Sequence, residues 1–161
     1  MSSGPTNNRA FSPSEKSGAV ETAYHLSTVQ RMLPLVRRIV EDLLQAHRRL
    51  AQLQGEREHL DRRRRTLAWP ERQRRYQLGE ELADQETHRE EVRAELEVLG
   101  IVLFTLTEGW VGFPTVVNQR RAYFVWHPGH DEVRHWQFEG EGTFRPIPTS
   151  WFEEVKAGSP R

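Results

Sequence analysis

The fold is decided by residues 34–67, which read PLVRRIVEDLLQAHRRLAQLQGEREHLDRRRRTL. Apolar residues recur along this stretch in two interleaved series, Val36, Leu43 and Leu50, and Ile39, Ala46, Leu53, Leu60 and Leu67. Spacings of three and four put both series on one stripe of an α-helix, as in a coiled coil. The first series continues into Arg57 and Arg64, so we expect the stripe to weaken toward its far end.

A second helix is predicted after the interruption at Trp69-Pro70, from about residue 71 to Leu99. Its stripe contains Leu78, Leu82, Val92 and Leu96, and Gly100 follows where a C-terminal glycine ends a helix without strain. Two helices of similar length with a short connection predict an antiparallel hairpin.

Charge supports this pairing. Residues 31–75 contain 13 Arg and 6 acidic residues, whereas residues 76–100 contain 8 acidic residues and 2 Arg. Folding one segment back on the other therefore places opposite charges side by side, which biases the choice of pairing even though each exposed ion pair contributes little.

The beginning of the hairpin carries two local signals. Ser27 followed by Gln30 is a capping-box pattern, in which the hydroxyl and the amide satisfy backbone N–H groups at a helix start. Leu33-Pro34 predicts a kink or a restart of the helix, because proline has no N–H and restricts the residue before it. Residues 1–22 are rich in Ser, Gly, Pro and Asn, and we interpret them as a disordered tail.

After Gly100 the apolar pattern changes to that of short strands, at residues 101–104, 113–117, 121–126 and 132–138. The predicted fold class is α+β, a long antiparallel two-helix coiled-coil hairpin followed by a small antiparallel β module of three or four strands. The predicted boundaries are residues 1–22 for the tail, 23–100 for the hairpin, 101–148 for the β module and 149–161 for a short C-terminal tail with one helical turn.

Composition excludes several classes of protein. The 161 residues include no Cys, so disulfides, thiolate metal sites and cysteine nucleophiles are ruled out. Lys+Arg and Asp+Glu both number 23, so no net charge draws the chain to nucleic acid or to a membrane. We find neither a signal-peptide pattern nor an apolar run long enough to span a bilayer, and we expect a cytoplasmic location.

Two stretches resemble the bacterial family known as domain of unknown function 2203. Residues 24–42 (YHLSTVQRMLPLVRRIVED) are similar to its opening. Several short segments are similar to its C-terminal half: Leu99-Gly100-Ile101, residues 108–114 (EGWVGFP), Phe124-Val125-Trp126, Pro128-Gly129 and residues 133–136 (VRHW). The resemblance implies an architecture, because the family has no established activity.

Four positions depart from the pattern of that family. Gly112 stands where the family has an acidic residue, Val125 where it has Cys, His130 where it has Glu, and Gln137 where it has His. Arg145 matches a family Arg near the end of the pattern. If the family uses a cluster of carboxylates and histidines, the resemblance implies that this chain has lost or rewired it.

Three histidines form the first candidate site. His127, His130 and His135 lie close in sequence with Asp131 and Glu132, and imidazole and carboxylate are ligands for Zn²⁺ or another divalent metal. The spacing matches no standard metal signature, so solvated turn and strand histidines are the competing interpretation.

The turn between the helices carries the second candidate site, an arginine cluster that suits phosphate or nucleic acid. Acidic residues are interleaved with it, so pairing with the acidic helix competes with this interpretation. The cluster consists of Arg62, Arg63, Arg64, Arg65, Arg72, Arg74 and Arg75, with Arg57 nearby.

Aromatic residues of the β module form a third group, which we assign to core packing in preference to a ligand groove. They are Trp110, Phe113, Phe124, Trp126, Trp136 and Phe138. No catalytic motif is visible. The leading hypothesis is therefore a non-enzymatic interaction or scaffold protein that uses the hairpin and forms a homodimer through it. A metal- or small-ligand-binding protein using the histidines is the alternative, and nucleic-acid contact through the arginine cluster comes third.

Overall fold

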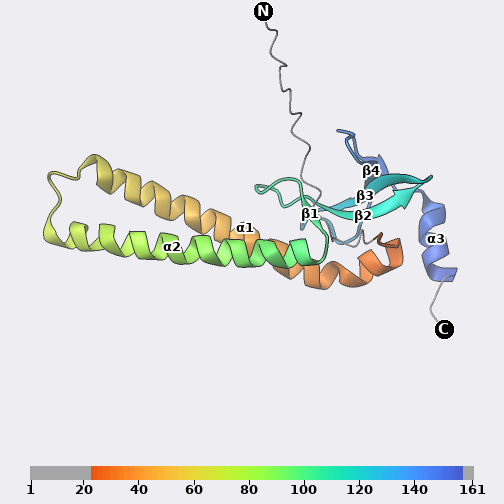
Figure 1. The fold of residues 1–161 in the computed structure, drawn as a ribbon, viewed down its shortest axis with the longest axis horizontal. Helices are drawn as coiled ribbons and strands as arrows, with labels where there is room; N and C mark the ends of the chain where they lie inside the picture. Colours follow the sequence, from red (N-terminus) through yellow and green to blue (C-terminus); the bar gives the residue numbers. More distant parts are fainter. Residues whose placement is uncertain (1–22, 158–161) are drawn as a thin grey trace, which may run out of the picture.

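The computed structural model of the protein describes residues 23–157, and side chains are described as far as Glu154. A helical hairpin extends from a small sheet, and a short third helix packs at the far end of the sheet (Figure 1). The tail predicted for residues 1–22 lies outside the described residues.

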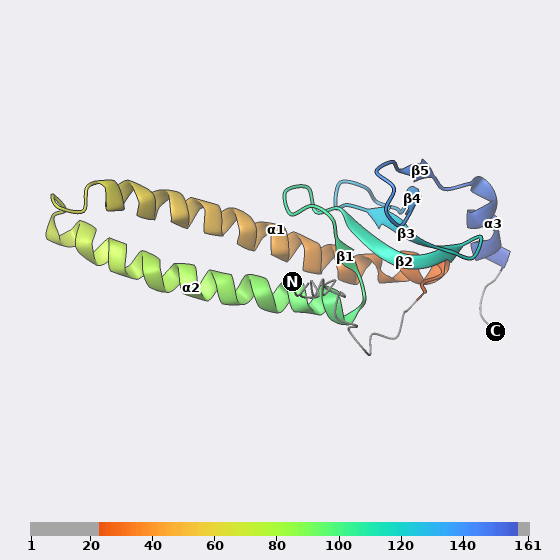
Figure 2. The ribbon, with the colours of Figure 1, turned by 45° about the horizontal axis from the view of Figure 1, so that its top comes forward.

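The hairpin consists of α1 (Leu26–Arg62) and α2 (Trp69–Val98), which run antiparallel side by side (Figure 2). Both series of apolar residues predicted for the first helix are buried, and so are Leu78, Leu82, Val92 and Leu96 of the second. Arg57 and Arg64, where the first series loses its apolar character, are exposed. The predicted antiparallel pairing of two apolar stripes is therefore confirmed.

Two local expectations at the start of α1, a capping box at Ser27 and a restart of the helix at Pro34, are wrong. The helix begins at Leu26 with His25 as N-cap and without a side-chain cap, so Ser27 lies inside the first turn and forms no capping box. Pro34 lies inside a continuous helix and neither ends nor restarts it. Proline removes only one helical hydrogen bond, and burial of Leu33 and Val36 on either side of it holds the helix together.

Five strands form one antiparallel sheet in the order β1-β2-β3-β4-β5. The strands are β1 (Val102–Leu103), β2 (Val111–Val117), β3 (Arg120–Trp126), β4 (His135–Phe138) and β5 (Arg145–Pro146). Asn118 and Gln119, both with positive φ, make the two-residue turn between β2 and β3, which suits the twist of a hairpin. The predicted α+β fold is confirmed, and the short β5 is a fifth strand beyond the three or four predicted.

Two separate apolar clusters stabilise the molecule. The larger cluster joins the sheet to the base of the hairpin and includes Val36, Leu43, Val92, Phe113 and Trp126. The smaller cluster lies in the distal half of the hairpin and consists of Leu50, Leu53, Leu60, Leu67, Leu78 and Leu82. The distal half therefore depends on its own six leucines, with no support from the sheet.

The C-terminal segment forms α3 (Thr149–Ala157), which is longer than the single turn expected from sequence. Trp151 of this helix packs near Trp136 and Phe124 of the sheet, at ring-centroid distances of 5.4 and 6.3 Å. Within residues 23–157, no helix is long and apolar enough to cross a membrane.

Candidate functional site

The three histidines predicted as a site lie together where β3 ends and β4 begins. His127 and His130 lie in the turn after β3, and His135 begins β4, where it pairs with Val125. The ring centroids of His127 and His130 are 4.2 Å apart, and those of His130 and His135 are 5.9 Å apart. We refer to these three residues as the histidine cluster.

Arg37 of α1 holds the turn that carries the histidine cluster. Its guanidinium donates to the carbonyl oxygens of Pro128 at 2.8 Å and His130 at 2.9 Å. The indole Nε1 of Trp126 donates to the same His130 oxygen at 2.9 Å, and the guanidinium carbon lies 5.1 Å from the Trp126 ring centroid. Arg37 was not predicted as a site residue, because nothing in a helical arginine signals a partner 91 residues away.

The imidazoles of His127 and His130 are biased toward the neutral form. Burial lowers the pKa of His127, partly opposed by the Glu108 carboxylate. Burial also lowers the pKa of His130, and the charges of His127 and Arg134 lower it further. The Gly129 N–H donates to Nδ1 of His127 at 3.2 Å, which leaves the proton of the neutral ring on Nε2.

The rings meet, but their nitrogens do not converge on one point. The Nδ1 atoms of His130 and His135 are buried without a hydrogen-bond partner. Neutral imidazoles with free lone pairs are chemically suited to bind a transition metal. However, in the described part of the chain no group of three His, Asp or Glu side chains has its atoms placed to hold a metal ion.

Aromatic rings enclose the histidine cluster. The Trp110 ring lies 4.2 Å from the His127 ring and 4.9 Å from the Phe144 ring, centroid to centroid, and its Nε1 donates to Glu108 at 2.7 Å. The other five residues of the predicted aromatic group are buried, which agrees with their assignment to the core. Within this aromatic group only Trp110 is half-buried, and it lies against the histidine cluster outside the core.

Three of the four positions that depart from the resemblance, Gly112, Val125 and Gln137, lie on one face of the sheet. Gly112 pairs with Val125, Val125 with His135, and Gln137 with Tyr123, so these residues share the face opposite Phe113, Phe124 and Trp136. The Phe104 ring covers Gly112, and a Cβ there would lie 2.6 Å from it. The phenyl ring of Phe104 therefore occupies the space that a side chain at position 112 would fill.

The arginine cluster predicted at the hairpin tip is partly neutralised. Arg74 forms ion pairs with Glu56 at 2.7 Å and Glu81 at 3.0 Å, Arg75 pairs with Asp61, and Arg63 pairs with Glu71 at 3.1 Å. Hydrogen bonds from Arg74 and Arg75 lower the pKa of Glu56 and of Asp61 respectively. Arg72 donates to the Leu67 carbonyl, which closes the turn.

The tip also carries two exposed aromatic side chains. Trp69 is 68% exposed and Tyr76 is 72% exposed. Large aromatic side chains beside arginines are typical of the residues that dominate binding at protein interfaces.

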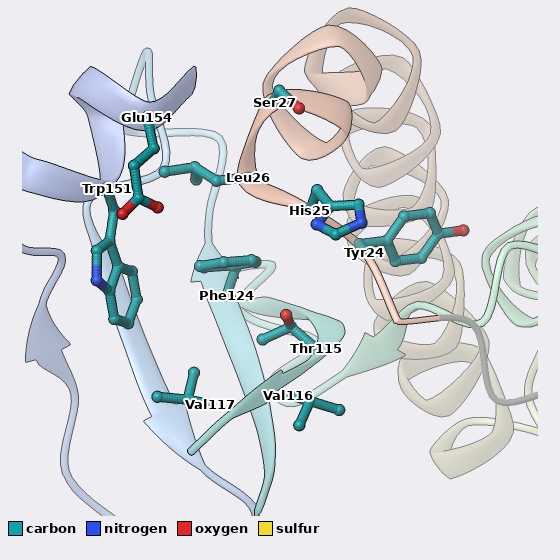
Figure 3. Close-up of a pocket in the computed structure, with 10 residues that line it drawn as sticks. All are labelled: Tyr24, His25, Leu26, Ser27, Thr115, Val116, Val117, Phe124, Trp151 and Glu154. Atoms are coloured by element: carbon teal, nitrogen blue, oxygen red, sulfur yellow. The ribbon is translucent and has the colours of Figure 1, made fainter. Parts of the chain in front are cut away.

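A pocket of about 460 Å³ opens at the opposite end of the molecule (Figure 3). The start of α1 (residues 24–27), β2 (residues 115–117), Phe124 of β3, and Trp151 and Glu154 of α3 line it. Tyr24 fixes this corner, because its N–H donates to the Pro114 carbonyl at 2.7 Å and its hydroxyl donates to the Leu99 carbonyl. Four segments distant in sequence form the pocket, so no local motif could have predicted it.

Comparison with known proteins gives one match. Residues 22–144 match the model of the family described as "Uncharacterized conserved protein (DUF2203)". No curated protein matches the chain. No solved structure matches it either.

Proposed function

The chain belongs to the DUF2203 family of uncharacterised conserved proteins, and we propose that it is a non-enzymatic interaction protein of the cytoplasm. Its proposed binding surface is the outer face of α2, and the proposed partner is a second copy of the chain. The two α2 helices pack antiparallel and extend each hairpin into a four-helix rod.

The exposed apolar residues of α2 carry this proposal. Trp69 and Tyr76 are seven residues apart, and Ala83 follows after another seven. At about 100° per residue, Trp69 lies roughly 180° around the helix from buried Leu78 and therefore faces away from α1. Val98, which is 85% exposed, lies on the same outer face at the other end of the helix.

Charge supports an antiparallel arrangement of the two copies. Residues 69–76 contain three Arg and one Glu, whereas residues 77–98 contain eight acidic residues and two Arg. Antiparallel packing places the basic end of each α2 against the acidic end of the other, and parallel packing places like charges together. A two-fold axis near Ala83 also brings Trp69 of one copy opposite Val98 of the other, with a small residue where the helices cross.

The distal leucine cluster supports the same function, because it keeps the tip folded without help from the sheet. A rigid arm loses little conformational freedom when it binds, and this favours association. The ion pairs of Arg74 to both helices add to the rigidity of the arm.

The absence of Cys from the sequence permits a direct test by disulfide trapping. An Ala83→Cys variant is expected to form a disulfide-linked dimer under mild oxidation, because residue 83 of each copy lies at the axis. The matched control is Ala94→Cys on the same exposed face. In the antiparallel dimer the two copies of residue 94 lie too far apart to form a disulfide. Crosslinking of Ala94→Cys at the same rate would refute antiparallel packing.

Light scattering after size exclusion tests the dimer itself. We expect a dimer for the unmodified chain at about 100 µM, and a monomer for a Trp69→Ser/Tyr76→Ser variant, since a few aromatic residues supply most of the energy of such interfaces. Leu35→Ser, which replaces a half-exposed apolar residue of α1, is the control and should stay dimeric. A monomeric unmodified chain would rule out the dimer.

Metal binding at the histidine cluster is the second candidate function. The two buried Nδ1 atoms without partners favour it, because an unsatisfied buried polar atom costs free energy that a bound metal would recover. Binding requires rotation of the rings, since the present placement gives no shared coordination point. Metal analysis of untagged protein tests it: stoichiometric Zn²⁺ that is lost in a His130→Ala variant is the expected result, and no bound metal would exclude it.

A further inference from the structure

The pocket between the start of α1, the sheet and α3 has the features of a site for an amphipathic anion. One wall is apolar and aromatic and contains Phe124, Trp151 and Leu26. A volume of about 460 Å³ lies within the range of small-molecule sites, roughly 300–1,000 Å³. The opposite wall is polar and is formed by the N-terminus of α1 and by Thr115 (Figure 3).

The N-terminus of α1 is the first feature that favours an anion. This helix has 37 residues, no side-chain cap and no acidic residue in its first turn. The first N–H groups of a helix have no partner within the helix, and the helix dipole places partial positive charge there. The Ser27 and His25 side chains line the same end of the pocket and can donate further hydrogen bonds.

Thr115 is the second and independent feature. It is only 9% exposed, and among the described residues its hydroxyl has no hydrogen-bond partner. Figure 3 shows this hydroxyl oxygen turned toward the first turn of α1. The hydroxyl can therefore donate a hydrogen bond to an acceptor bound in the pocket.

The charges around the pocket select the kind of anion. No Arg or Lys is among the described lining residues, and the Glu154 carboxylate lines the pocket beside Trp151 (Figure 3). A phosphate carries close to two negative charges and is usually bound by arginine or lysine, so it fits poorly here. A carboxylate carries one charge and is satisfied by helix N–H groups and hydroxyls.

We propose that this pocket binds small organic monocarboxylates, with the carboxylate at the first turn of α1 and the Thr115 hydroxyl, and an apolar body between Phe124 and Trp151. The site lies at the opposite end of the molecule from the hairpin tip and is independent of the proposed dimer. It gives the protein a small-molecule ligand as well as a protein partner.

Titration of the full-length ¹⁵N-labelled protein by NMR tests the proposal, with phenylacetate as the probe and uncharged phenylacetamide as its matched control. We expect saturable shifts at the backbone amides of Ser27 and Thr28 and at the indole N–H of Trp151. A ligand of this size is expected to bind with a Kd on the order of 1 mM. The amide should bind about tenfold more weakly, because it lacks the charge.

Two substitutions at one position separate binding from folding. Thr115→Val keeps the shape and removes the hydroxyl, and should weaken phenylacetate binding about fivefold. Thr115→Ser keeps the hydroxyl and should retain binding, and Thr87→Val on the exposed surface of α2 should leave it unchanged. Equal binding of the two probes, undiminished binding by Thr115→Val, or no saturable shift at about 20 mM phenylacetate would each overturn the proposal.

Discussion

The substitution Leu53→Ala tests whether the distal half of the hairpin is an independent unit of stability. Leu53 is buried in the distal leucine cluster, and Leu43, three helical turns away and equally buried, belongs to the cluster shared with the sheet. Removing a fully buried leucine side chain costs roughly 3 kcal/mol, through lost burial and the cavity left behind. A loss of about 3 kcal/mol increases the population of the opened state about 150-fold.

Hydrogen exchange followed by mass spectrometry resolves where that opening occurs. In Leu53→Ala we expect amides of residues 47–86 to exchange about 100-fold faster and those of the sheet to keep their protection, because the two clusters share no residue. Leu43→Ala is the matched control and should accelerate exchange in the sheet as well as in the helices. Equal acceleration of sheet amides in both variants would refute the division into two clusters.

Three further outcomes are expected near the sheet. Gly112→Ala should lower the free energy of unfolding, measured by urea denaturation, by about 1–2 kcal/mol, because its Cβ would lie 2.6 Å from a neighbouring phenyl ring. Gly142→Ala is the control, since a Cβ at that position would have nothing within 4 Å. Burial lowers the pKa values of His127 and His130, so the unfolded chain binds more protons below about pH 6.5, and stability should decrease as the pH falls through that window. A His127→Gln/His130→Gln variant should flatten this dependence, and an unchanged slope would contradict it. Arg37→Gln should lower the free energy of unfolding by about 1.5–3 kcal/mol, because the hydrogen bonds of Arg37 to the turn are lost. It should also broaden the NMR signals of the imidazoles in that turn. Unaltered imidazole signals would argue against the role of Arg37 in holding the turn.

Sequence alone determined the hairpin, because its information is local and repeated. A stripe that begins at Val36 and continues at spacings of three and four can bury itself only against another stripe, and the short link around Pro70 leaves the antiparallel partner as the simplest one. The strands were also predicted, since alternation and turn residues are local signals. Helix starts were predicted less well: burial of Leu26 overrode the local preference of Ser27 for a cap.

Sites depend on contacts between distant segments, and for these the residue pattern indicates candidate residues without their geometry. It named His127, His130 and His135 but could not determine whether their rings meet, which follows from the pairing of β3 with β4 and from Arg37 on α1. The pocket beside Thr115 carried no signal at all, because its walls come from four segments between residues 24 and 154. Periodicity determines which face of an element is buried, whereas only tertiary packing determines which polar groups are left facing one another in the same space.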